Sequence, residues 1–171
     1  RWPRSPFTAV GLVLGVVSFF NILYGTLVGI SKFEVKDIEF HHPNLPKAFD
    51  GYRIVQLSDI HIGSWIDNEK TINELVELVN AQKPDLIVFT GDLVNQRSCE
   101  LEGFQDILAQ LHAKDGVYSI LGNHDYGSYY HWKNLKEQVN NIDNLIRMQK
   151  TMGWKLLNNE YDILHLSLIH I

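Results

Sequence analysis

The sequence predicts an α/β domain that follows a membrane-spanning helix. Three short apolar runs, each rich in β-branched or aromatic residues, alternate with segments of helical periodicity between residues 53 and 152. This alternation is typical of a parallel sheet whose neighbouring strands are joined by right-handed crossovers. Ahead of these segments lies a long run without charge, which has the length and composition of a membrane span.

The three apolar runs are predicted as buried strands at residues 53–58, 86–90 and 117–121. Each is short and stops at a turn that contains Gly or Asp, as strands in the interior of a sheet do. Residues 34–40 alternate apolar and polar side chains and are predicted as a further short strand. Because Pro43 and Pro46 interrupt the segment after it, we expect an irregular linker over residues 41–51.

Three segments have apolar residues at helical spacing. The first covers residues 72–79, and the second covers residues 101–111 with Ser98 as its N-cap. The third covers residues 132–148 and stops near Gly153. We expect these helices to pack beside the sheet.

The run from Phe7 to Ile30 contains no charged residue and one strongly polar residue, Asn21. At about 1.5 Å per residue, it reaches the roughly 30 Å of a bilayer's hydrocarbon core. A buried core helix and a cleaved signal peptide are the alternatives, but the run lacks a polar face and a clean cleavage site. We expect a transmembrane helix. Basic residues near its two ends are equal in number, so its orientation stays undecided.

Composition excludes several classes of protein. The 171 residues carry a formal charge of −5, which argues against a nucleic-acid binder held by neutralised phosphates. Residues 1–33 carry +3, so the remainder is more acidic still, at −8. With a single cysteine, Cys99, the chain has no internal disulfide and no Cys-rich zinc module.

Polar side chains follow each of the three predicted strands. Asp59 and His61 follow the first strand, Asp92 follows the second, and Asn123 and His124 follow the third. Because the carboxyl ends of parallel strands meet at one edge of a sheet, we expect these residues to converge. Asp59 and His61 are two residues apart, so in a regular strand both side chains face the same side.

This set of residues predicts a metal site. Oxygen and nitrogen ligands without thiolate suit Mn, Fe, Zn or Mg. Carboxylates crowded together repel one another strongly unless a cation lies between them. Each motif alone is weak support for a metal site, but their joint occurrence at the ends of three predicted strands is strong support. Gly91 and Gly122, which precede two of them, permit tight turns and a close backbone approach to a ligand.

The three motifs, SDIHIG, TGDLVN and LGNHDYG, resemble the successive motifs of the calcineurin-like metallophosphoesterases. The resemblance is greatest to the bacterial membrane-anchored branch, and it extends from the apolar helix to about Asn159. It implies a transmembrane helix followed by the first half of a metallophosphoesterase-type α/β sandwich. The expected segments are a membrane anchor (1–33), a linker with a short strand (34–51) and the phosphoesterase domain (52–171), incomplete at its C-terminus.

The resemblance also implies a role for each site residue. Asp59 and His61 bind the first of two divalent ions, Asp92 bridges both, and Asn123 binds the second. His124 contacts the phosphate and stabilises charge or protonates the leaving group. A metal-bound hydroxide attacks phosphorus in line, with ions about 3.5–4 Å apart.

Asn95 and Asp125 are expected to support the site. The protein-phosphatase branch of the family has an aspartate at the position of Asn95, where it orients the histidine. An asparagine accepts a hydrogen bond through its side-chain oxygen but lends no negative charge. This departure lowers our expectation of protein-phosphatase activity.

The resemblance leads us to expect further ligands that the motifs found here do not supply. The tail contains His165 and His170, but their surroundings do not match the family's later histidine motifs, and we do not assign them as ligands. The last residues also look unlike the family. We therefore expect this chain, expressed alone, to be inactive and prone to aggregate, since its sheet would keep an uncovered edge.

Two functions of different classes remain. The first is metal-dependent hydrolysis of phosphodiesters or phosphomonoesters, with a lipid-linked or nucleotide-derived substrate, at a bacterial inner or cytoplasmic membrane. The second is a membrane protein with a non-catalytic phosphoesterase-like domain that binds or regulates. The presence of His124 and of both first-metal residues favours the enzyme. No nucleic acid is expected as a partner.

Overall fold

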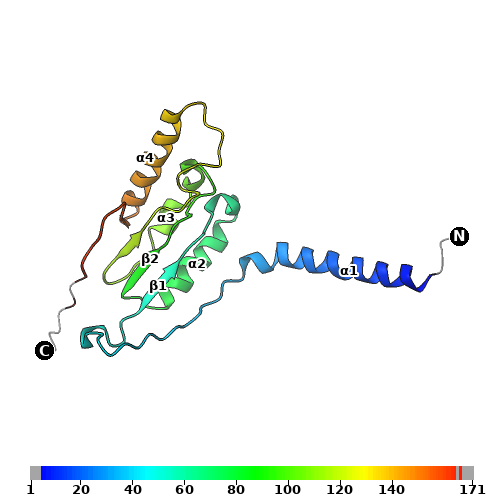
Figure 1. The fold of residues 1–171 in the computed structure, drawn as a ribbon, viewed down its shortest axis with the longest axis horizontal. Helices are drawn as coiled ribbons and strands as arrows, with labels where there is room; N and C mark the ends of the chain where they lie inside the picture. The colour runs from blue at the N-terminus through cyan, green and yellow to red at the C-terminus, as the bar shows by residue number, and fades with distance from the viewer. Residues whose placement is uncertain (1–4, 165, 167–171) are drawn as a thin grey trace. The chain divides into compact units, whose positions relative to one another are not determined.

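A computed structural model describes residues 5–164 and 166 of the chain (Figure 1). His165 and His170, which the sequence analysis does not assign as ligands, lie outside these residues, as do the basic residues that precede the apolar helix. The chain divides into two compact units, with the boundary between Phe40 and His41.

The first unit contains a single α-helix, α1 (Pro6–Leu27), followed by a 3-10 turn at Gly29–Ser31. None of its residues is buried, although nearly all are apolar. Within the described part of the chain, the 26 residues of Pro6–Ser31 form the one helical segment long and apolar enough to cross a membrane. An apolar surface of this size is stable where lipid or another protein covers it.

The short strand expected at residues 34–40 is wrong. The structure describes all of these residues, and they form neither strand nor helix. Alternating polarity fits a strand only where a neighbouring strand supplies hydrogen bonds, and no strand of the described residues pairs with this segment. The linker after it includes a 3-10 turn at Lys47–Phe49.

The second unit consists of a sheet with helices between its strands (Figure 1). Its strands are β1 (Ile54–Leu57), β2 (Leu86–Phe89), β3 (Val117–Ser119) and β4 (Lys155–Leu156). Its α-helices are α2 (Glu69–Ala81), α3 (Gln105–Leu108) and α4 (Leu135–Thr151). Two 3-10 turns, Ile62–Trp65 and Ser98–Leu101, follow β1 and β2.

The sheet is parallel throughout, in the order β1-β2-β3-β4. Each crossover therefore steps in the same direction, and right-handed crossovers then place their helices on one face. Burial agrees: Ile87 and Phe89, which share a face of β2, are 0% and 1% exposed, while Ile54 on the opposite face of β1 is 55% exposed. The predicted α/β fold with a parallel sheet is confirmed.

Two elements differ from the sequence-based expectation. The single helix expected over residues 101–111 is instead a 3-10 turn and the four-residue α3, separated at Gly103, whose φ of 87° is incompatible with a helix. Ser98 is consequently inside the 3-10 turn and not a helix N-cap. The two-residue β4 was not expected, because so short a segment carries no periodicity.

The buried carboxylate of Asp125 joins the turn after β2 to the turn after β3. Its side chain is 0% exposed and accepts four backbone N–H groups. The donors, at 2.9–3.1 Å, are the amides of Asp92, Leu93, Val94 and Gly122. Burial raises the pKa of Asp125, and the four donors oppose that rise because they stabilise the charged form.

Two glycines let the same turns touch. A Cβ at Gly122 would lie 2.5 Å from the backbone nitrogen of Asp92 and would overlap its carboxylate. Gly91 has a φ of 104°, and a Cβ there would lie 2.6 Å from the nitrogen of Gly122. The backbone approach that these glycines permit in the structure is therefore of one turn to the other, and not the approach to a ligand that the sequence suggested.

The segment after β4 is tied to the sheet by Asp162. Its carboxylate accepts hydrogen bonds from the Tyr118 hydroxyl of β3 and from the Lys155 ammonium of β4. These contacts, led by the bond from Lys155, lower the pKa of Asp162 to about 2. A lowered carboxyl pKa contributes stability that is present above the unfolded pKa of about 3.9 and is lost as the pH falls toward 2.

We predict that Lys155→Ala moves the titration midpoint of Asp162 upward toward its ordinary value. The main partner that stabilises the carboxylate is then missing, while the Tyr118 hydroxyl stays. NMR titration of the Asp162 carboxyl carbon measures the midpoint in the wild type and in the variant. Lys150→Ala, at an exposed position of α4, is the control. Equal midpoints in Lys155→Ala and the control would show that the contact with Lys155 is not made in solution.

We predict that Asp125→Asn destabilises the fold by about 2–5 kcal/mol, because each carboxylate oxygen serves two N–H donors and an amide leaves two of them facing an NH₂ group. The midpoint of urea unfolding measures the loss. Asp143→Asn, on an exposed position of α4, is the matched control and should leave the midpoint unchanged. An Asp125→Asn midpoint equal to that of the control contradicts the role given to this carboxylate.

Candidate metal centre

The turns after β1, β2 and β3 lie at one edge of the sheet, as the parallel topology requires. Backbone pairing of β1 with β2 continues beyond the strand ends into two of them. The Asp59 amide donates to the Gly91 carbonyl at 3.0 Å, and the His61 amide donates to the Asp92 carbonyl at 3.1 Å. Residues separated by more than 30 positions are therefore held in fixed register.

Three predicted site residues, one from each turn, form a compact group. One ligand-type atom from each of His61, Asp92 and His124 lies within 4.8 Å of the others. The rings of His61 and His124 meet edge to face, with centroids 4.6 Å apart. Asp59 lies beside this group because its Oδ1 is 3.8 Å from His61 Nε2. The structure thus brings together four of the five side chains expected to converge. The fifth, Asn123, directly precedes His124, and its Nδ2 donates to the Tyr129 hydroxyl.

The backbone at these residues is strained. Asp59, His61 and Asp92 have φ values of 55°, 46° and 59°, in the left-handed region. They are three of the six non-glycine residues with positive φ in the described chain. Such conformations cost of order 1–3 kcal/mol each and cluster at functional sites. The sequence-based argument that Asp59 and His61 point the same way in a regular strand is wrong, because β1 ends at Leu57 and both residues are left-handed.

Apolar neighbours hold the first turn in place. Ile60 and Ile62, on either side of His61, are 8% and 0% exposed. The Trp65 indole N–H donates to the Ile60 carbonyl at 2.9 Å and closes the turn. Burial of the two isoleucines leaves Asp59 and His61 on the outer side of the turn, where the Asp59 side chain is 62% exposed.

His124 is oriented by a main-chain carbonyl and a side-chain carboxylate of the second turn. Its Nδ1 is 2.7 Å from the Asn95 carbonyl oxygen, and its own amide donates to Asp92 Oδ1 at 2.8 Å. Because a carbonyl oxygen only accepts, Nδ1 carries the hydrogen and Nε2 is the nitrogen left for a ligand or a proton.

Asn95 supports His124 differently from the way the sequence suggested. Its main-chain carbonyl, not its side chain, accepts from the imidazole. The side-chain Nδ2 instead donates to Ser64 Oγ at 2.9 Å and ties the second turn to the first, while Oδ1 is buried without a hydrogen bond to any described residue. Any residue type supplies a backbone carbonyl, so the asparagine does not weaken this contact.

Sequence reasoning missed two residues at this edge. The carboxylate of Glu100 accepts from the amides of Asn95 and Arg97, at 2.6 and 3.0 Å, and so fixes the second turn. Its bond back to the Arg97 amide, three residues earlier, is the glutamate half of a capping box, but Arg97 has no side-chain acceptor, so the sequence signal of a capping box is absent. The other missed residue is Tyr129, whose hydroxyl accepts from Asn123 Nδ2 at 3.1 Å and whose ring lies 4.8 Å from that of His124.

The donor set fits a divalent cation. It combines imidazole nitrogens with carboxylate and amide oxygens, the ligands that Mn, Fe, Zn and Mg accept. The Asp92 side chain is 8% exposed, and a carboxylate that is nearly buried next to a second acid is stabilised by a cation between them. The imidazole of His124, beside these ligand-type atoms, is oriented through its Nδ1, which leaves Nε2 without that contact.

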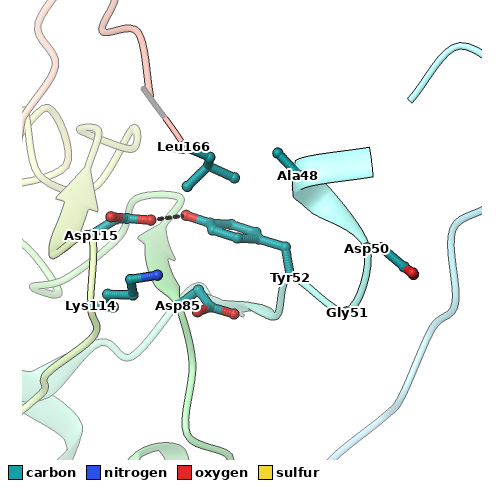
Figure 2. Close-up of a pocket in the computed structure, with 8 residues that line it drawn as sticks. All are labelled: Ala48, Asp50, Gly51, Tyr52, Asp85, Lys114, Asp115 and Leu166. Carbon is teal, nitrogen blue, oxygen red and sulfur yellow. Dashed lines mark hydrogen bonds between the residues drawn. The ribbon is translucent and has the colours of Figure 1, made fainter. Parts of the chain in front are cut away.

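A hollow of about 500 Å³ lies at the opposite edge of the sheet, at the amino ends of the strands (Figure 2). Tyr52, Asp85, Lys114 and Asp115 are among its lining residues. Figure 2 shows the Tyr52 hydroxyl donating to Asp115, a bond of 2.6 Å. Burial, together with this bond, raises the pKa of Tyr52, so the phenol keeps its proton. Asp85 accepts from the Arg53 amide, so these carboxylates serve the fold.

Comparisons with known proteins agree with this geometry. The family model described as calcineurin-like phosphoesterase matches residues 52–170. The chain is 32% identical over 149 residues to an uncharacterized metallophosphoesterase of Campylobacter jejuni, covering 87% of this chain and 36% of that protein. It is 35% identical over 104 residues to a "transmembrane protein with metallophosphoesterase domain" of Danio rerio, covering 61% and 24%.

A third relative is the UDP-2,3-diacylglucosamine pyrophosphatase LpxG of Chlamydia trachomatis, 36% identical over 103 residues, covering 58% of this chain and 31% of that protein. The chain thus spans about a quarter to a third of the length of these relatives. No solved structure matches it significantly. With its apolar helix, the likeness to membrane-associated relatives indicates membrane association. The chain belongs to the calcineurin-like phosphoesterases, a family of hydrolases that use divalent metal ions.

Proposed function

We propose that the protein hydrolyses phosphoester bonds, in diesters or monoesters, at a centre of two divalent metal ions. The observation that carries this proposal is the convergence of His61, Asp92 and His124 from three separate turns, within 4.8 Å of one another. Family membership supports phosphoester hydrolysis in general. The number of ions and the role of each residue belong to the proposal.

In this proposal Asp59 and His61 hold the first ion, Asp92 holds both, and Asn123 holds the second. Asp92 suits the shared position because the Asp125 contacts fix its backbone and it lies between the first and third turns. Asn123 lies at the exposed side of the third turn. Divalent ions, when bound, neutralise charge on the phosphoryl oxygens and lower the pKa of bound water toward neutrality.

His124 is proposed as the residue that stabilises or protonates the leaving oxygen. The Nδ1–H group of His124 is hydrogen-bonded to the Asn95 carbonyl. When the ring is protonated, the Nε2–H group is therefore the one that donates its proton to the leaving oxygen. The Tyr129 ring on one side and the His61 ring on another restrict the imidazole to a narrow range of orientations. Neither serine nor cysteine is needed as a nucleophile.

We propose further that residues 1–33 anchor the protein in a bacterial inner or cytoplasmic membrane and that residues 52–171 contribute to the hydrolytic domain. The helix Pro6–Ser31 and the bacterial relatives support this arrangement. One of those relatives is named for a lipid-linked nucleotide-sugar diphosphate. A lipid-linked or nucleotide-derived phosphoester is therefore the proposed class of substrate.

We predict that Asp92→Asn and His124→Ala separate metal binding from catalysis. Asp92→Asn loses a charged ligand, so calorimetric affinity for Mn²⁺ falls by at least about 10-fold, as even second-shell losses do. His124→Ala keeps Mn²⁺ affinity but lowers kcat for bis-p-nitrophenyl phosphate by about 10²–10⁴-fold, as loss of a general acid does. The kinetics are measured on the full-length protein, with Asp106→Asn on α3 as the control.

Two results contradict the proposal in different ways. If His124→Ala loses Mn²⁺ affinity as Asp92→Asn does, His124 is a metal ligand and the proposed proton donor is wrong. If the full-length protein binds Mn²⁺ but shows no metal-stimulated hydrolysis on a panel of diesters and monoesters, the domain is a non-catalytic binding or regulatory module.

For the substrate class, we predict that the full-length protein in vesicles hydrolyses UDP-2,3-diacylglucosamine with a higher kcat/KM than UDP-glucose. The membrane anchor concentrates the site at the surface where a lipid-linked substrate resides. Water attacks one phosphorus of the P–O–P link that both compounds share, and the products are UMP and the sugar 1-phosphate. This bond is a phosphoanhydride between two phosphorus atoms that each also carry an ester, and release of UMP measures both rates. Equal values of kcat/KM, or a preference for the water-soluble compound, would remove the lipid-linked class from the proposal.

A further inference from the structure

Tyr129 lies on the loop between Asp125 and α4 and contacts two proposed site residues at once. Its hydroxyl accepts a hydrogen bond from Asn123 Nδ2 at 3.1 Å. Its ring is tilted by 36° against the imidazole of His124, with centroids 4.8 Å apart. Although 59% of Tyr129 is exposed, its polar end is turned toward the site.

The loop that carries Tyr129 is held by its own aromatic contacts. The Trp132 indole N–H donates to the Gly127 carbonyl at 2.7 Å. The Tyr130 ring packs edge to face on Trp132, with centroids 4.7 Å apart, and Arg97 lies 5.2 Å from the centre of the Tyr130 ring. Tyr129 therefore projects from a loop that is anchored to the second turn through Arg97.

The hydrogen bond in the structure leaves the oxygen of the Asn123 amide for the proposed second ion. An asparagine side chain ends in one acceptor oxygen and one donor NH₂, and a cation binds only the oxygen. With Nδ2 turned toward the Tyr129 hydroxyl, Oδ1 is the atom left for the ion. A tyrosine hydroxyl both donates and accepts, so it serves either end of a free amide, but with a cation at Oδ1 it accepts from Nδ2 and stabilises the orientation that binds the ion.

We propose that Tyr129 is a positioning residue whose hydroxyl holds the Asn123 amide with its oxygen toward the second metal ion. The proposal rests on the proposed function, in which Asn123 is a ligand. It assigns the hydroxyl group a role separate from that of the ring, which packs on His124 in any case. A tyrosine and a phenylalanine at this position therefore differ in metal affinity and not in packing.

The first arm of the test uses Tyr129→Phe, with Tyr130→Phe as the matched control on the same loop. Calorimetric titration of the full-length protein with Mn²⁺ should show that Tyr129→Phe weakens binding of the lower-affinity ion by about 10–100-fold, the size expected for loss of a group that orients a ligand. Tyr130→Phe should match the wild type. Equal affinity in the two variants overturns the proposal.

The second arm asks whether Tyr129 acts through Asn123. In an Asn123→Ala background, Tyr129→Phe should cause no further loss of Mn²⁺ affinity, because the group it orients is absent. Additive losses mean that the hydroxyl acts by another route and overturn the proposal. Urea midpoints of the four proteins of this cycle show whether the affinity differences arise from unfolding.

The third arm needs no metal. The Asn123 side-chain amide signals in an ¹⁵N-correlated NMR spectrum should shift in Tyr129→Phe and stay in place in Tyr130→Phe, because only the first removes the hydrogen-bond acceptor. Unshifted signals in both overturn the contact itself. If the contact is seen but wild type binds Mn²⁺ no better than Asp92→Asn, it is the proposed metal centre that fails, and the role of Tyr129 in it fails too.

Discussion

Four backbone N–H groups from two turns converge on the carboxylate of Asp125, and the proposed metal centre depends on this interaction. Because one anion satisfies donors from both the Asp92 turn and Gly122, the two turns cannot separate without leaving buried polar groups unpaired. Gly122 brings them closer than any larger residue allows, which places the Asp92 carboxylate against the His124 amide. Asp125, which does not itself face the site, thus determines the position of the ligand-type side chains.

At the same edge, the backbone conformations and the nearly buried acid are unfavourable in free energy, and a bound cation would offset this. Asp59, His61 and Asp92 hold left-handed backbone conformations, and Asp92 is a nearly buried acid with Asp125 behind it. Sheet pairing, buried isoleucines and the contacts of Glu100 supply the rigidity that keeps these conformations in place. A site built on such a frame is preorganised, so little ordering remains to be done when an ion binds.

Much of the fold was readable from the sequence because periodicity and the residues after each apolar run report on it directly. The three main strands, α2 and α4 follow from the apolar runs and the helical spacing of the sequence. The convergence of Asp59, His61, Asp92 and His124 follows from the rule that parallel strands end at one edge. What failed depended on tertiary context. Residues 34–40 lack a pairing partner among the described strands, and Gly103 divides a helical pattern. The hydrogen bond of the Asn95 main chain and that of the Tyr129 hydroxyl could not be predicted, because neither produces a periodic pattern in the sequence.

The central claim is that divalent metal binds where the three turns meet. Anomalous diffraction from crystals of the protein grown with Mn²⁺ tests it most directly, because the Mn signal locates the ion without reference to activity. The account predicts an anomalous peak within coordination distance, about 2.0–2.3 Å, of the Asp92 carboxylate and the His61 imidazole. Strong Mn²⁺ peaks elsewhere on the molecule, with none at these residues, would contradict it.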